Sequence, residues 1–156
     1  MSILLIDKSN TAGFSANVGE LLKALKNKVF NNSPDEAPIM VHQSTGDGEE
    51  AQPVTCVFKC GSCDKLHIES GWYDTANLVL TKDAVIYQDY RDREDKYIQR
   101  SELIKILGRI DAHDKIYICT TQDLSLAPLT IVMKCSDECP SVHLLSGYSV
   151  NSISAN

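Results

Sequence analysis

Apolar residues near the start of the chain follow two patterns in succession. The continuous run Ile3–Asp7 is typical of a buried strand. Ser15 or Asn17 can cap the start of a helix, and Glu20 stands three residues after Asn17, as a capping box requires. That helix carries apolar residues at intervals of three and four, namely Val18, Leu21, Leu22, Leu25 and Val29. The pattern therefore predicts a strand followed by an amphipathic helix.

Short apolar runs bounded by turn residues dominate the rest of the chain and are typical of strands. They lie at residues 38–42, 54–58, 77–80, 84–90, 115–120 and 129–134. Residues 101–108 fit either a short capped helix or a strand, and periodicity does not decide between them. The predicted fold class is α+β, with the N-terminal strand and helix followed by a mainly antiparallel β region that a zinc site clamps.

An abrupt change in composition divides the chain. Residues 44–53 are acidic, contain two glycines and lack apolar anchors, which predicts a mobile loop between segments 1–43 and 54–145. Residues 146–156 are rich in serine and asparagine and predict a flexible tail. A chain of 156 residues with 43% hydrophobic residues is long enough for one buried core, so a single domain is expected overall.

Charge and cysteine content narrow the function classes. The formal net charge is −6 and no stripe of lysine and arginine is present, so generic nucleic-acid binding is not expected. No apolar run is long enough to cross a membrane, and the N-terminal run lacks the features of a signal peptide. Six cysteines in such a chain favour free thiols or metal ligands in a reducing, cytoplasmic compartment rather than disulfides.

Two pairs of cysteines carry the candidate metal chemistry. Cys60 and Cys63 have the spacing of a zinc knuckle, and Cys135 and Cys139 form a second, looser pair. Thiolates bind Zn²⁺ tightly, and two pairs far apart in sequence suit a tetrahedral site that joins two parts of a fold. The four cysteines are therefore the predicted zinc ligands, and no other cofactor is expected.

Several residues are alternatives to this ligand set. His67 and His143 each lie four residues after a cysteine and can replace one, and Cys56 is a third alternate. Free cysteines can instead be small buried hydrophobic residues, which is the expected identity of Cys119 in its apolar run. A redox role for Cys60 and Cys63 is disfavoured because no amphipathic helix follows them.

A thiol nucleophile is the remaining chemical alternative. Such a cysteine needs a histidine base within hydrogen-bond reach in the folded protein. Cys63 and His42 form the candidate pair, and sequence spacing alone does not establish that they meet. Whether the protein is an enzyme is thus left open at this point.

Five short segments are similar, in the same order, to the pestivirus N-terminal autoprotease, a viral leader cysteine protease that binds zinc and removes a host antiviral transcription factor. They are residues 41–45, 61–63, 85–90, 107–110 and 115–119. The resemblance implies that Cys63 is a nucleophile and Cys119 a zinc ligand. Two features differ. The segment after His42, where that family has its catalytic histidine, is acidic here, and the chain does not end at a cysteine, so self-release at this terminus is not expected.

Two functions from different classes follow from these observations. The first is a zinc-binding protein-interaction module whose acidic residues 47–50 steer a basic protein partner. The resemblance implies that such a module is a viral antagonist of a host factor. The second is a leader-type cysteine autoprotease that uses Cys63. A metal-bound thiolate is shielded whereas a catalytic one is reactive, so thiol reactivity separates the two.

Overall fold

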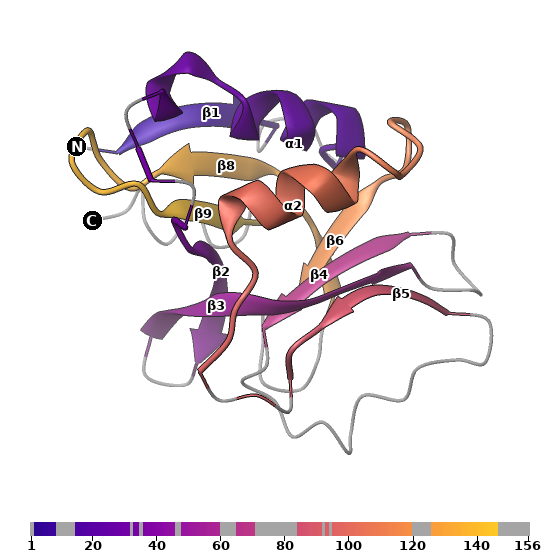
Figure 1. Cartoon of the computed structure of the whole chain (residues 1–156). Coiled ribbons are helices and arrows are strands. Elements are labelled where there is room, and N and C mark those ends of the chain that lie inside the picture. The colour runs from indigo at the N-terminus through magenta and orange to yellow at the C-terminus, as the bar shows by residue number, and fades with distance from the viewer. Residues whose placement is uncertain are drawn as a thin grey trace.

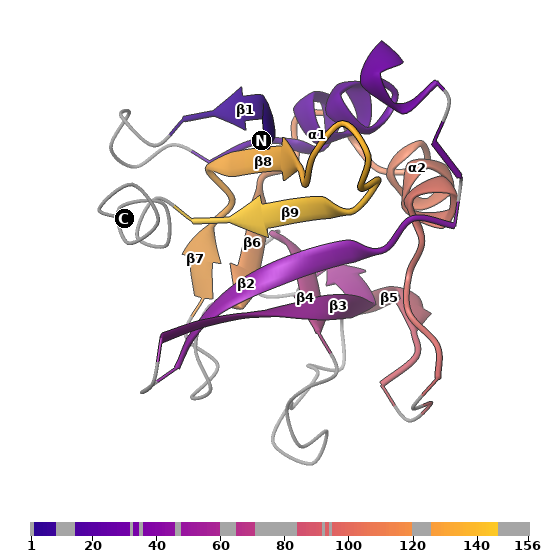
Figure 2. The same cartoon turned by 90° about the vertical axis from the view of Figure 1, so that its left-hand side faces the viewer.

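Nine strands in the described part of the chain form one curled, mixed sheet, and two helices lie together over one side of it (Figure 1). The computed structural model describes residues 2–8, 15–31, 33–34, 36–45, 48–59, 65–70, 84–91, 93, 95–119 and 126–146, with the backbone alone at 43–45, 48–50, 119 and 126. The strand order is β1-β8-β9-β2-β3-β4-β6-β7, and β5 pairs with β3. Figure 2 shows β1, β8, β9, β2 and β3 side by side.

The elements follow one another along the chain as strand, helix and then mostly strands. The helices are α1 (Val18–Leu25), a 3₁₀ turn (Lys28–Phe30) and α2 (Arg100–Leu107). The strands are β1 (Ile3–Asp7), β2 (Ile39–Thr45), β3 (Gly48–Lys59), β4 (Leu66–Ser70), β5 (Val85–Asp89), β6 (Ile116–Cys119), β7 (Leu126–Pro128), β8 (Ile131–Lys134) and β9 (Val142–Leu145). The N-terminal strand and helix, followed by a region rich in strands, confirm the coarse fold prediction.

The long strand β3 joins the two halves of the sheet. Its first half pairs antiparallel with β2, and its second half pairs antiparallel with β4 and β5. Two ladders, β2 with β9 and β4 with β6, are parallel. The sheet is therefore mainly antiparallel, and its parallel ladders join strands that are distant in sequence.

Helix α1 begins where its sequence predicts. The Asn17 side chain accepts a hydrogen bond from the backbone N–H of Glu20 at 2.8 Å, and the Glu20 carboxylate accepts one from the backbone N–H of Asn17 at 3.0 Å. This reciprocal capping box satisfies two N–H groups that have no partner within the helix. The α-helix ends at Leu25 rather than at Val29, and a 3₁₀ turn follows.

The interior is filled by both helices and by the inward faces of the strands. Val18, Leu21 and Leu25 of α1 are buried against the sheet together with Leu103 and Leu107 of α2. The strands contribute one aliphatic layer: Ile39, Val41, Val54, Val57, Leu66, Ile68, Ile116, Ile118, Val132, Val142 and Leu144. Burial of a single large aliphatic side chain contributes about 1.5–3 kcal/mol, so this layer dominates the stability of the fold.

The predicted loop at 44–53 is wrong for most of its length. Residues 48–53 form the first half of β3 and pair with residues 40–45 of β2. A ladder needs backbone N–H and C=O groups in register rather than apolar side chains, so an acidic, glycine-containing segment still forms a strand when a partner strand lies beside it. The turn residues 46–47 and the predicted tail at 147–156 lie outside the described residues.

The structure also settles the ambiguous segment at 101–108, which belongs to helix α2. Pro128, expected in a connection, instead ends the short strand β7, which lies at the end of the strand order where a missing N–H costs little. Strand β9 was not predicted. No described helix is long and apolar enough to cross a membrane.

Candidate functional site

Cys135 and Cys139 come together in the turn that connects β8 to β9. The backbone N–H of Cys135 donates to the Ser141 carbonyl at 2.8 Å, which extends the β8–β9 ladder by one pair. The Ser136 hydroxyl accepts a hydrogen bond from the backbone N–H of Cys139 at 2.9 Å. These bonds close residues 135–141 into a tight turn, which we call the dithiol turn, with both thiols partly exposed to solvent.

The two thiols of the dithiol turn interact directly. Cys135 donates a hydrogen bond to the Cys139 sulfur, and this bond raises the pKa of Cys135. The backbone N–H and then the hydroxyl of Ser141 donate to Cys139 and lower its pKa, because hydrogen bonds to a thiolate favour the charged form. The turn therefore presents one sulfur with thiolate character and a second sulfur beside it.

Lys134 supports the dithiol turn by hydrogen bonds to its backbone. Its side chain is 1% exposed, which is unusual for a lysine. The ammonium group donates to the backbone carbonyls of Ser136 at 2.5 Å and Asp137 at 3.1 Å. Lys134 thus fixes two carbonyls between the cysteines and places a positive charge near their sulfurs.

A second polar cluster lies on β3 and β4, on the face opposite the aliphatic layer. Cys56 pairs across the ladder with Glu69, and Phe58 pairs with His67. The His67 ring stacks on Phe58 with ring centres 4.8 Å apart and planes at 7°, and its Nδ1 lies 3.6 Å from a Glu69 oxygen. All of these residues are buried in the folded chain.

Burial makes Cys56 chemically inert. Desolvation is the largest cause that raises the pKa of its thiol to about 12, and the nearby Asp89 and Glu69 carboxylates add to it. The Arg91 guanidinium opposes them but is itself held by Asp89 through two hydrogen bonds of 2.8 Å. Cys56 is therefore a protonated, buried thiol and a poor metal ligand.

Two histidines meet on the outer face of β2 and β9. His42 Nε2 and His143 Nδ1 lie 2.6 Å apart, so one ring donates a hydrogen bond to the other. Burial, followed by the charge on His42, lowers the pKa of His143 to about 4, and burial also lowers the pKa of His42. Both rings are neutral at neutral pH. Two nitrogens bound to one Zn²⁺ ion lie roughly 3.3 Å apart, so the pair as it stands is a hydrogen bond rather than a chelate.

The remaining predicted site residues are not brought together by the described part of the chain. Cys60 and Cys63 lie outside the described residues, as does the side chain of Cys119. The ends of β3 and β4 that flank residues 60–64 and the dithiol turn lie on opposite sides of the molecule in Figure 1. Within the described ranges, no three histidine, cysteine, aspartate or glutamate side chains are grouped to hold a metal ion. The four-cysteine clamp stays a prediction.

The arrangement of β2 and β3 also bears on the alternative in which Cys63 is a nucleophile and His42 is its base. His42 pairs with Ala51, and Lys59 follows Ala51 by eight residues along β3. An extended strand of that length covers roughly 26 Å, so the described strands do not bring His42 to the end of β3 that precedes Cys63. His42 also already contacts His143. A pairing of Cys63 with His42 therefore receives no support from the described residues and stays a prediction.

No family model, curated protein or solved structure matches this chain. The resemblance to the pestivirus N-terminal autoprotease remains an expectation from five short segments. The candidate site must be judged on its own geometry.

Sequence reasoning missed Lys134 and the partnership of His42 with His143. A lysine at the end of an apolar run is normally read as the first solvated residue after a strand. The histidines are 101 residues apart and meet only because β2 and β9 pair in parallel. Neither feature has a local signal, whereas the spacing of Cys135 and Cys139 is visible in the sequence, and their role as metal ligands stays a prediction.

Proposed function

We propose that the protein is a metal-binding interaction domain in which Cys135 and Cys139 hold a zinc ion at the dithiol turn. The observation that carries the proposal is the dithiol turn itself, in which the backbone hydrogen bonds of Cys135 to Ser141 and of Cys139 to Ser136 hold the two cysteines in one turn. Two sulfur ligands of a tetrahedral zinc ion lie roughly 3.8 Å apart, given a Zn–S bond of about 2.3 Å. Two cysteines held in one turn are a suitable source of two such ligands.

The surroundings of the two sulfurs suit thiolate ligands. The Ser141 amide and hydroxyl donate toward Cys139, in the way that backbone amides support thiolates in zinc knuckles. Lys134 adds a nearby positive charge and holds the turn through two carbonyls. The support around the metal ligands is thus built into the fold.

The proposed ion has coordination positions left over. The dithiol turn supplies two ligands, and a zinc ion in a structural site usually has four. Ligands from a partner protein or solvent complete the coordination, so the ion becomes part of an interaction surface. This arrangement replaces the intramolecular four-cysteine clamp as the simplest zinc site for this fold.

A zinc titration of the chelator-treated full-length protein, in competition with a chromophoric chelator, tests the proposal. The wild-type protein should bind one ion, and Cys135→Ser with Cys139→Ser should weaken binding by about 100-fold or more, because loss of even supporting residues costs 10–100-fold. Cys56→Ser is the matched control and should leave zinc affinity unchanged.

A second double variant separates the two zinc sites. Cys60→Ser with Cys63→Ser should keep zinc binding if the dithiol turn is the site, and should lose it if the four-cysteine clamp exists. Wild-type protein that binds no zinc, or a Cys135→Ser, Cys139→Ser protein that binds it like the wild type, would overturn the proposal.

A further inference from the structure

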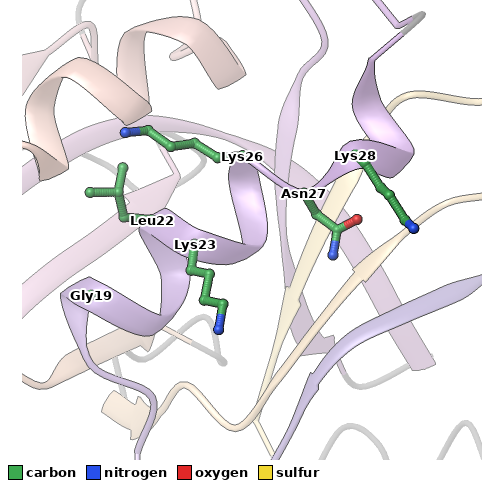
Figure 3. Close-up of a pocket in the computed structure, with 6 residues that line it drawn as sticks. All are labelled: Gly19, Leu22, Lys23, Lys26, Asn27 and Lys28. Carbon is green, nitrogen blue, oxygen red and sulfur yellow. The ribbon is translucent and has the colours of Figure 1, made fainter.

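A groove of about 600 Å³ runs over the outer side of α1 and the turn after it. Its lining consists of Gly19, Leu22, Lys23, Lys26, Asn27 and Lys28. In Figure 3 Leu22 and Lys26 extend to one side of the helix, and Lys23, Asn27 and Lys28 to the other. Gly19, at the start of the helix, packs closely against Ala112, because a Cβ at this position would lie 3.1 Å from the Ala112 Cβ. We call this surface the lysine groove.

The lysine groove is positively charged without compensation. None of its three lysines forms an ion pair with another described residue, and the described part of its lining contains no acidic residue. The only acidic residue of α1 is Glu20, which caps the helix and pairs with Lys8 at 2.8 Å. The excess charge stands out in a chain whose net charge is −6.

The fold does not require this charge. The opposite side of α1, with Val18, Leu21 and Leu25, makes the contacts with the core. One cation in the last turn is enough to interact with the dipole of an eight-residue helix. Additional like charges at nearby positions repel one another. Their grouping around one groove points to a ligand.

We propose that the lysine groove binds an acidic peptide segment of a partner protein, with an apolar side chain of the segment against Leu22 and its carboxylates on the lysines. The proposal rests on the interaction role proposed above and names the chemistry of the partner. A groove of this volume accommodates a few peptide residues. The contacts combine a small apolar area at Leu22 with three charge pairs at the rim.

The composition of the lysine groove favours a peptide over a nucleic acid. Among the described residues that line it, there is no arginine for bidentate phosphate contacts and no aromatic side chain on which a base can stack. Three lysines, on α1 and in the turn after it, also neutralise few phosphates, and the net charge of −6 repels a long polyanion. Carboxylates on a short segment match the number and spacing of these charges better.

Fluorescence anisotropy with a labelled peptide of alternating glutamate and leucine tests the proposal. The wild-type protein should bind it at low salt, and Lys23→Glu with Lys26→Glu should weaken binding at least about 10-fold, because attraction becomes repulsion. Lys105→Glu with Lys115→Glu changes the charge equally at exposed positions outside the groove and should change binding less than about 2-fold. A peptide with glutamine in place of glutamate should bind weakly to all proteins.

A charge swap makes the test independent of folding defects. A peptide of alternating lysine and leucine should bind the Lys23→Glu, Lys26→Glu protein better than the wild type. Equal binding of the acidic peptide to wild type and groove variant, or tighter binding of a single-stranded RNA oligonucleotide than of the peptide, would overturn the proposal. Peptide binding is measured with chelator present, and zinc titration of the groove variant should match the wild type, so failure here is distinct from failure of the zinc site.

Discussion

Cys56 and the dithiol turn show how differently one fold treats the same side chain. Cys56 lies in the middle of β3, is 0% exposed and has a pKa of about 12. Cys135 and Cys139 lie in a turn, touch each other and reach solvent, and Ser141 lowers the pKa of Cys139. Burial disfavours the thiolate form of Cys56, whereas the hydrogen bonds at Cys139 favour it.

The difference arises from where each cysteine lies in the fold: burial is the main cause that raises the pKa of Cys56, and the strand supplies no donor to oppose it. A residue in the middle of a strand has its backbone groups engaged in the ladder, so no N–H is left to donate to its sulfur. A turn leaves N–H groups such as that of Ser141 free to point at a thiolate. Thiol chemistry in this protein should therefore be found where the ladders end.

Thiol reactivity should show the largest contrast between the two regions. The rise of the Cys56 pKa from 9.0 to about 12 corresponds to about 1000-fold less thiolate. Iodoacetamide added to metal-free native protein at neutral pH should label Cys139 at least about 100-fold faster than Cys56, as measured by peptide mapping with mass spectrometry. In concentrated urea the two rates should converge. Equal labelling rates of Cys139 and Cys56 in the native protein would show that the two environments do not differ in thiol reactivity.

Lys134→Met should weaken zinc binding by about 10-fold or more. The variant removes the donors that hold the Ser136 and Asp137 carbonyls and the positive charge near the sulfurs. Competition titration measures the change, and Lys105→Met, at an exposed position on α2, is the matched control. Unchanged affinity in the Lys134 variant would show that this lysine serves the fold without serving the site.

Burial of the histidine pair should have a smaller effect, which is a dependence of the free energy of unfolding on pH. The pKa of His143 is about 4 in the folded protein, below its ordinary value of 6.5, so the neutral form is favoured by folding. The stabilisation is fully present above pH 6.5 and is lost as the pH falls toward 4. The loss should be about 1–2 kcal/mol, less than the full pKa shift implies, because the pair is partly exposed to solvent.

Urea unfolding of wild type and of His143→Gln at several pH values measures this loss. The variant should lose less stability between neutral pH and pH 4.5, whereas His113→Asn, at an exposed turn, should behave like the wild type. If the free energy of unfolding falls equally with pH in the wild type and in His143→Gln, the prediction is contradicted.

Local features of this fold were predictable from the sequence, and long-range ones were not. The capping box of Asn17 and Glu20 was predicted correctly because all of its atoms lie within three residues. The helical periodicity of the apolar residues predicted α1 but extended the helix to Val29. Periodicity alone does not reveal the change from an α-helix to a 3₁₀ turn. The apolar runs at 3–7 and 84–90 gave β1 and β5.

The errors share one physical origin. Residues 48–53 form a strand because β2 offers them a ladder, and their own composition gives no sign of it. The contact of His42 with His143 depends on a parallel pairing of strands distant in sequence. For the candidate site, spacing identified Cys135 and Cys139, but the supporting roles of Lys134 and Ser141 depend on the shape of the turn.

X-ray absorption at the zinc edge tests the central proposal most directly, because it counts the sulfur atoms bound to the metal. The zinc-loaded full-length protein should show two sulfur ligands at about 2.3 Å, with nitrogen or oxygen in the other positions. The same measurement on Cys60→Ser with Cys63→Ser should give the same spectrum. A count of four sulfurs, or of none, would contradict a zinc site built on the dithiol turn.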